Sequence, residues 1–167
     1  LILVHRLPQQ FKRMFVALYD SENYYLINID KKADATIGED IRGFLKDYTN
    51  VSVLTSENVT WGGYSMVQAE LDGIKYLLNE DINWEYFINL SGQDYPLKSQ
   101  EIIRNYLTNN KDKNFIKIAN QKNIRPETMN RIEHYYEEAN DNSVTSTHKR
   151  PYLDNVTPYI GGQWMIL

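Results

Sequence analysis

The 167-residue sequence contains no cysteine, which excludes a disulfide framework, a thiol nucleophile and a zinc site built on cysteine. It also lacks any apolar run of the ~18 residues that a membrane-spanning helix needs. Basic residues are not in excess, since 18 Lys and Arg stand against 22 Asp and Glu. A phosphate footprint needs clustered cations, so we expect no nucleic-acid partner.

Several ligand-binding motifs are missing as well. No glycine-rich fingerprint follows the first predicted strand and no P-loop is present, which argues against a dinucleotide site of the usual type. The sequence has no Asp-x-Asp pair, the usual arrangement that holds a divalent metal on a nucleotide-sugar diphosphate. Its three histidines, His5, His134 and His148, lack metal-ligand spacing. We therefore expect neither a metal nor another cofactor.

The composition is that of a folded protein, with 42% hydrophobic and 24% charged residues. The length suits one domain, and we predict a single domain over residues 1–167. Both ends lie in apolar runs, Leu1 to Val4 and Trp164 to Leu167, whereas natural termini are usually polar. We therefore expect this domain to be truncated, a piece of a longer one that is incomplete at the C-terminus.

Strand-like and helix-like segments alternate along the chain. Strands are expected at 1–4, 24–29, 51–54, 86–90 and 114–118, and helices begin at Pro8, near Ile37, at Ser65 and at Ser99. The alternation predicts an α/β fold with a mainly parallel sheet flanked by helices.

Three local features are predicted for the rest of the chain. Ser65 and Gln68 have capping-box spacing, in a helix whose apolar stripe is Val67, Leu71, Ile74 and Leu78. A polar helix is expected over 127–138. The segment 139–158 is rich in Asn, Ser, Thr and Pro, which indicates a mobile loop.

Ligands of parallel sheets bind at the carboxyl ends of the strands. The polar residues expected there are His5-Arg6, Asp30 to Lys32, Ser56-Glu57 and Ser91 to Asp94. Asp30 would accept hydrogen bonds from a ribose hydroxyl or a base imide. The alternative is a solvated turn acid paired with Lys31 or Lys32.

Two further segments carry candidate site residues. In the segment 61–65, two glycines precede a helix N-terminus, where free amides favour an anion or a closely approaching ligand, and Trp61 and Tyr64 offer flat faces for a sugar ring or base. The alternative is a tight loop with aromatic core anchors. Asp94 follows a buried strand, where it would orient substrate or act as a base, or else only cap the turn.

A late group, Arg131 with Tyr135 and Tyr136, suits the wall of an acceptor groove. Ordinary packing of the predicted helix against the sheet would explain the same residues.

Several segments together resemble a known family. They are Val4-His5, INIDKK at 27–32, NVSVL at 50–54, WGGYSMVQAEL at 61–71, WEYFINLSGQDYPLKS at 84–99 and GGQW at 161–164. In this order they resemble the core-2/I-branching glycosyltransferases, which include β-1,6-N-acetylglucosaminyltransferases and peptide O-xylosyltransferases. The resemblance covers nearly the whole chain.

The resemblance implies a GT-A fold, a UDP-sugar donor and metal-free transfer with inversion at the anomeric carbon. By motif match, the donor-side residues are Val4, His5 and Asp30 around the uridine, Trp61, Gly63 and Ser65 near the donor, and Asp94 at the cleft floor. Arg131 and Trp164 match the acceptor side. Asn28 departs from the family, which often has a histidine there.

The family's general base, a glutamate, and the Arg and Lys that neutralise the departing diphosphate lie beyond the segment matching Leu167. An inverting displacement needs both functions, because the base raises acceptor nucleophilicity and the cations stabilise the leaving charge. The catalytic base is therefore assigned to no residue of this chain, and we expect the 167 residues alone to be inactive.

The expected function is transfer of GlcNAc or xylose from a UDP-sugar to a hydroxyl of a glycan or protein. One alternative is a non-catalytic module that binds nucleotide sugars or glycans on the same fold. A second is a nucleotide-dependent α/β enzyme of another class, such as a flavodoxin-like protein. Because secretory-pathway members of the family are disulfide-rich, the absence of cysteine predicts a bacterial, cytoplasmic enzyme, with peripheral association with the inner face of the membrane left open.

Overall fold

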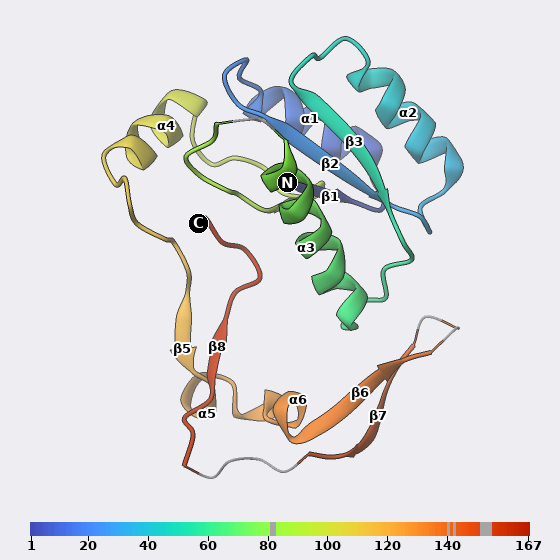
Figure 1. Ribbon diagram of the computed structural model, residues 1–167, viewed down its shortest axis with the longest axis vertical. Coiled ribbons are helices and arrows are strands. Elements are labelled where there is room, and N and C mark those ends of the chain that lie inside the picture. The colour runs from blue at the N-terminus through green and yellow to red at the C-terminus, as the bar shows by residue number, and fades with distance from the viewer. Residues whose placement is uncertain (81–82, 140, 142, 151–154) are drawn as a thin grey trace.

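A four-stranded parallel sheet with helices on both faces forms the first part of the chain (Figure 1). The computed structural model describes residues 1–80, 83–139, 141, 143–150 and 155–167. The strand order is β3-β2-β1-β4, and every neighbouring pair is parallel. The strands are β1 Ile2–Val4, β2 Tyr25–Asp30, β3 Val51–Ser56 and β4 Leu90–Ser91. The helices between and after them are α1 Pro8–Leu18, α2 Ala35–Leu45, α3 Tyr64–Asn79 and α4 Gln100–Thr108. The predicted α/β fold is confirmed.

One face of the sheet is covered by α1 and α2. Pro8 occupies the first turn of α1, where its missing N–H costs nothing, and the helix then buries Phe11, Met14 and Phe15 completely. These side chains pack with Ile27 of β2 and with residues of α2. Because β2 is buried on both faces, its sequence reads as a continuous apolar run, as is typical of a central parallel strand.

The other face is covered by α3. The side of α3 that packs on the sheet differs from the apolar stripe that the sequence predicted. Val67, Leu71 and Leu78 are 49%, 45% and 66% exposed, while Ala69, Gly73 and Leu77 are buried. Small residues let the helix come close: a Cβ on Gly73 would lie 2.9 Å from a methyl carbon of Leu1. The predicted stripe is wrong at these three positions, although Ile74 does pack in the core.

The predicted capping box at Ser65 is also wrong. The N-cap residue of α3 is Gly63, whose own side chain cannot cap the helix. Gln68 instead donates to Asp72, one turn further along the helix. The cap predicted at Ser99 is confirmed, since its side chain accepts from the backbone N–H of Ile102 at the start of α4.

The later part of the chain forms two antiparallel pairs. β5 Ile118–Asn120 pairs with β8 Tyr159–Gly161, and β6 His134–Glu138 pairs with β7 Val144–Lys149. Between β5 and β6 lie three short helices, α5 Gln121–Ile124, η1 Pro126–Thr128 and α6 Asn130–Glu133.

Three predictions for this region need correction. The helix predicted over 127–138 is wrong over most of its length, because the chain is helical only in the short η1 and α6 and continues as β6 from residue 134. The loop predicted over 139–158 is wrong at 144–149, which is β7, while 140, 142 and 151–154 lie outside the described residues. The strand predicted over 114–118 begins only at Ile118; Phe115 forms a single bridge to Ile166.

The hairpin of β6 and β7 gains its order from contacts between its two strands. The rings of Tyr135 and His148 lie 4.7 Å apart, and the guanidinium of Arg150 lies 5.4 Å from the centre of the Tyr135 ring.

Along the described ranges, no helix combines the length and the apolar character that crossing a membrane requires.

Candidate functional site at the carboxyl edge of the sheet

The parallel register brings the polar residues that follow the four strands to one edge. Val4 stands opposite Ile29, and Asp30 stands opposite Ser56, so β1, β2 and β3 end at neighbouring levels. On the other side, Leu3 stands opposite Ser91 of β4. His5, Asp30, the loop after β3 and the loop after β4 therefore share this edge, as predicted.

Val4 and Gly92 form the floor beneath this edge. Val4 is 2% exposed, and the N–H of Gly92 donates to the carbonyl of Leu3 at 2.8 Å. A Cβ on Gly92 would lie 3.1 Å from a methyl carbon of Val4, so glycine permits the close approach of the two segments. The side chain of Val4 is therefore part of the buried floor, and contact of Val4 with a ligand stays a prediction.

Asp94 closes the turn after β4. Its Oδ2 accepts from the N–H of Ser91 at 2.7 Å, and its own N–H donates to the Ser91 carbonyl at 3.0 Å. The turn-capping alternative for Asp94 is therefore present in the structure. Capping uses one of its two carboxylate oxygens, and contact of this side chain with a ligand stays a prediction.

Asp30 joins two loops. Its Oδ1 accepts from the N–H of Lys32 at 2.9 Å and from the N–H of Val59 at 3.4 Å. The ammonium of Lys31 pairs with Glu57 at 3.0 Å instead of with Asp30. Asp30 is thus an acceptor between the turn after β2 and the loop after β3. Of the turn-acid alternative, the pairing with Lys31 is wrong, whereas the turn bond from the N–H of Lys32 is present.

His5 follows β1 on the same edge. Partial burial lowers the pKa of His5 below its ordinary value of 6.5, and the positive charges of Arg6 and Lys32 act in the same direction, against the opposing effect of Asp30. The imidazole is therefore mainly neutral at pH 7. A neutral imidazole has one donor and one acceptor nitrogen, which suits an uncharged polar ligand group.

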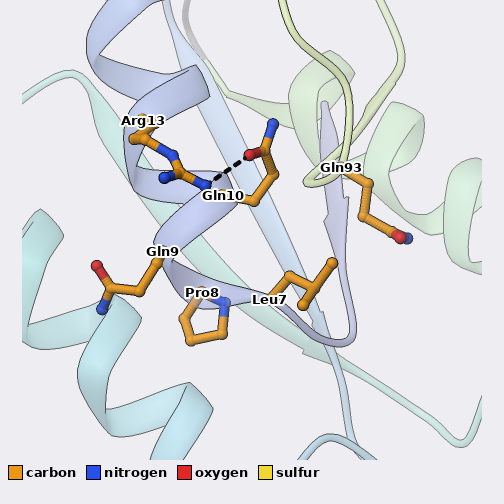
Figure 2. A pocket seen from close by; sticks show the side chains of 6 residues that line it. All are labelled: Leu7, Pro8, Gln9, Gln10, Arg13 and Gln93. Atoms are coloured by element: carbon orange, nitrogen blue, oxygen red, sulfur yellow. Dashed lines mark hydrogen bonds between the residues drawn. The ribbon is translucent and has the colours of Figure 1, made fainter.

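Arg6 connects the loops after β1 and β4, since its Nε donates to Oε1 of Gln93 at 3.1 Å. Beside this contact is a pocket of about 450 Å³ at the start of α1, shown in Figure 2. Its lining residues are Leu7, Pro8, Gln9, Gln10, Arg13 and Gln93. Leu7 has a φ of 54°, an uncommon conformation for a residue with a side chain.

The loop between β3 and α3 carries the predicted donor-side residues Trp61, Gly63 and Ser65. Trp61 is 85% exposed and Tyr64 is 65% exposed, so the alternative of aromatic core anchors is wrong. Gly62 has a φ of 79°, which glycine adopts without strain. The hydroxyl of Ser65 accepts from the N–H of Thr60 at 2.7 Å, which closes the loop on itself.

Glu138, at the end of β6, contacts the residue that follows this loop, Ser65 at the start of α3. No sequence motif pointed to this contact. It accepts from the backbone N–H of Ser65 at 2.6 Å and from the Ser65 hydroxyl at 2.7 Å. These donors hold the pKa of Glu138 below its ordinary value, so the carboxylate is charged at pH 7. No local pattern signals this contact, because its partners are 73 residues apart.

The two predicted acceptor-side residues lie on other elements. Arg131 is exposed on α6, at the base of the β6–β7 hairpin and outside the four-stranded sheet (Figure 1). Trp164 is 41% exposed and follows β8. The structure therefore does not place Arg131 on the sheet edge that carries Asp30.

Asn89, a second residue outside the predicted site, holds the segment of Trp164. Its Nδ2 donates to the carbonyl of Gln163, and its Oδ1 accepts from the N–H of Met165, both at 2.8 Å. Asn89 is 2% exposed, so its end of both bonds is buried, whereas Gln163 at the other end of one of them is exposed. A polar residue inside a predicted strand is the signal that would have found it.

Across the described ranges, His, Asp and Glu residues nowhere form a group of three or more that would hold a metal ion.

The whole chain, residues 1–167, matches the family model of the Core-2/I-Branching enzymes. The chain belongs to this family.

Relatives in the Core-2/I-Branching family include two kinds of transferase. A xylosyltransferase of Ciona intestinalis is 31% identical over all of this chain and 20% of the relative. Xylosyltransferase 2 of Rattus norvegicus is 31% identical over all of the chain and 19% of the relative. A rat β-1,3-galactosyl-O-glycosyl-glycoprotein β-1,6-N-acetylglucosaminyltransferase 3 is 27% identical over 99% of the chain and 37% of the relative. The chain thus spans well under half the length of these relatives.

Proposed function

We propose that this chain is the donor-binding part of an inverting, metal-independent glycosyltransferase. The enzyme transfers GlcNAc or xylose from a UDP-sugar to a hydroxyl group of a glycan or protein. Family membership supports glycosyl transfer as the reaction class, because the relatives are xylosyltransferases and an N-acetylglucosaminyltransferase. The two donor sugars are the ones that the names of these relatives contain or imply.

The observation that carries the proposal is the meeting of His5, Asp30 and the loop after β3 at one sheet edge. A carboxylate has about four acceptor positions, and the amides of Lys32 and Val59 use part of this capacity at Oδ1 of Asp30. The remaining capacity suits a ribose hydroxyl or the N–H of a uracil imide. The neutral imidazole of His5 on the same edge adds one donor and one acceptor.

The loop that follows β3 suits the sugar end of the donor. Trp61 presents an exposed indole, whose flat apolar face packs against the C–H face of a pyranose ring. Gly63 keeps side-chain atoms away from the backbone at this point. Asp94, in the loop after β4 at the same sheet edge, would receive a polar group of the donor.

On the acceptor side we assign Trp164 and Arg131. Trp164 is held between two hydrogen bonds of Asn89, so its indole is presented from a fixed backbone. Arg131 is an exposed cation, suited to a polar or acidic group of an acceptor. The general base is assigned to none of the residues named here, and neither is the neutralisation of the departing diphosphate.

A non-catalytic module that binds nucleotide sugars or glycans is the competing function. The same donor-side residues would serve it, so binding alone does not separate the two. An assay of sugar transfer by the protein expressed from its full-length open reading frame would separate the two functions.

We further propose that the enzyme is bacterial and works in the cytoplasm, associated with the inner face of the membrane, as the lack of cysteine suggests. Cell fractionation with an antibody against the protein tests this placement.

Calorimetric titration of the full-length protein with UDP, ADP, FMN and NAD tests the donor class. We expect heat with UDP and little with the other three, and no heat with UDP would refute the proposal. Transfer from UDP-GlcNAc and UDP-xylose is then assayed with and without EDTA. Activity that disappears on chelation and returns with a divalent metal would contradict metal independence.

A further inference from the structure

The end of the β6–β7 hairpin lies against the start of α3, where the donor-side loop joins the helix (Figure 1). One side chain makes the contact. Oε1 of Glu138 accepts from the N–H of Ser65 and Oε2 accepts from the Ser65 hydroxyl, and the side chain of Thr60 also interacts with this carboxylate. The hairpin is thereby tied to an element that precedes it by 73 residues.

These bonds extend into the loop. The Ser65 hydroxyl donates to Glu138 and at the same time accepts from the N–H of Thr60. Because the hydroxyl proton points to the carboxylate, a lone pair of the oxygen is available to Thr60. A continuous series of donors and acceptors thus runs from Thr60, which is 4% exposed, to Glu138 on the surface.

Thr60 is buried at the start of the loop, whereas the two aromatic side chains that follow it do not anchor the loop. Trp61 and Tyr64 are exposed, and Gly62 and Gly63 give the backbone large conformational freedom. Asp30 holds the loop at Val59. Glu138 and Ser65 hold the other end, so the residues between them are fixed from two sides.

The fit at Gly63 is tight. A Cβ there would overlap the carboxyl group of Glu138, closer than real carbon atoms approach. Any larger residue at position 63 therefore displaces the Glu138 side chain. Charge supports the same arrangement, because a carboxylate is stabilised at a helix N-terminus and the Ser65 donors keep Glu138 ionised.

We propose that Glu138 is a positioning residue, which holds the loop of residues 60–65 in the conformation that receives the UDP-sugar. The inference rests on the proposed function. It also gives Ser65 a different task from the one that the family resemblance implies. Ser65 spends its N–H and its hydroxyl on Glu138, so it acts through the shape of the loop and not by binding the donor.

The hairpin itself connects the two sides of the proposed site, because it begins next to Arg131 on α6 and ends at the donor-side loop. Arg131 is our acceptor-side assignment. A ligand that moves this hairpin would move the loop through Glu138, and the reverse holds equally because such coupling is reciprocal.

The experiment compares Glu138→Ala, Ser65→Ala and the double variant in the full-length protein. Glu137→Ala is the matched control, because Glu137 is the exposed neighbour on the same strand. Two readouts are used, amide hydrogen exchange of residues 60–66 without nucleotide, and the kinetics of transfer. Circular dichroism of each variant checks that the fold is kept.

We expect Glu138→Ala and Ser65→Ala each to speed exchange of the loop and to raise the KM for the UDP-sugar about three- to tenfold, the scale of losing one ordinary, solvent-exposed hydrogen bond. The kcat should change little. Both substitutions remove the bond between the Ser65 hydroxyl and Glu138, whereas only Glu138→Ala also removes the bond from the Ser65 N–H. The effect of the double variant should therefore be smaller than the sum of the two single effects. Glu137→Ala should behave as the wild type.

Faster exchange with an unchanged KM would overturn the proposal, because the contact would then be structural only. Tighter UDP binding by Glu138→Ala would overturn it as well, because Glu138 would then compete with the donor. Failure of the wild type to bind UDP is a different result. That result refutes the proposed function. Normal UDP binding by the wild type, together with an unchanged KM in Glu138→Ala, refutes only this inference.

Discussion

The backbone N–H of Met165 donates at 2.8 Å to the side-chain oxygen of Asn89, which is itself 2% exposed. The same side chain donates to the carbonyl of Gln163, so one amide pairs with both neighbours of Trp164. A strand would make these bonds with its backbone. Here the Asn89 side chain adds two bonds beyond the backbone pairing of Phe87 with Leu167, and the backbone that carries the Trp164 indole is held at a defined place.

Replacing Asn89 with Ala should lower the free energy of unfolding by about 1–3 kcal/mol, because two part-buried hydrogen bonds from a buried side chain are lost. Chemical unfolding in urea measures the change. Asn123→Ala is the control, since Asn123 is exposed on α5, and it should stay within ~0.5 kcal/mol of the wild type. Equal stabilities of the two variants would show that the Asn89 bonds contribute nothing.

Replacing Asp30 with Asn should weaken UDP binding by about 1–3 kcal/mol, roughly five- to 150-fold, because a charged acceptor is lost from a site that binds hydrogen-bond donors. Asn keeps an oxygen for the amides of Lys32 and Val59, so the loops should stay in place. Calorimetry measures the affinity. Asp47→Asn, at an exposed position after α2, should bind UDP normally. Unchanged binding by Asp30→Asn would make Asp30 a turn residue only.

The parallel half of the fold was predictable because its signals are local. The run Tyr25 to Ile29 is apolar at every position except Asn28, as a strand buried on both faces must be. Pro8 marks the start of α1, and Ser99 caps α4. Each of these features depends on a few neighbouring residues, which a sequence displays directly.

The hairpin and the start of α3 were not predictable in this way. β6 and β7 are polar and mostly exposed, so their alternation carries no burial signal. Their order comes from pairs such as Tyr135 with His148 across the hairpin. Ser65 has the local pattern of a cap, yet its donors go to Glu138, which lies far along the chain. The long-range contact with Glu138, and not the local capping pattern, determines the hydrogen bonds of Ser65.

The residues of the candidate site also differ in whether local sequence signals could reveal them. His5 and Asp30 were found because strand ends meet at one edge in any parallel sheet. Asn89 and Glu138 were missed because each acts on a segment more than 70 residues away. Arg131 and Trp164 came from the family resemblance, and their meeting with the donor-side residues depends on long connections that periodicity does not describe.

Two glycines offer a paired test of packing beneath the site. Ala at Gly92 would place its Cβ 3.1 Å from a methyl group of the buried Val4, and the crowded core cannot yield freely. We expect about 1–3 kcal/mol of destabilisation. Gly43, inside α2, has nothing within 4 Å of the point where a Cβ would lie, so Gly43→Ala should stabilise by about 0.5–1 kcal/mol. Urea unfolding measures both, and effects of the same sign would contradict this view of the floor.

The titration of His5 tests the electrostatics of the edge. Burial and the charge of Arg6 lower its pKa, while Asp30 opposes them. We expect a midpoint below 6.5 when the ring protons of His5 are followed by NMR. Arg6→Gln should raise the midpoint, because a repelling cation is removed. Asp30→Asn should lower it further, because a stabilising anion is removed. Shifts of the opposite sign in both variants would show that His5 does not sense these charges.

The same shift predicts how stability depends on pH. The pKa of His5 is lower in the folded state than in the unfolded chain, so between the two values the unfolded state binds more protons. The contribution of His5 to stability is therefore complete above about pH 6.5 and falls as the pH drops through the folded-state value. His5→Gln should lose this part of the pH dependence, which urea unfolding at about pH 7.5 and about pH 5.5, on either side of the ordinary histidine pKa, would reveal. An identical loss of stability on acidification in the wild type and in His5→Gln would assign the effect to other groups.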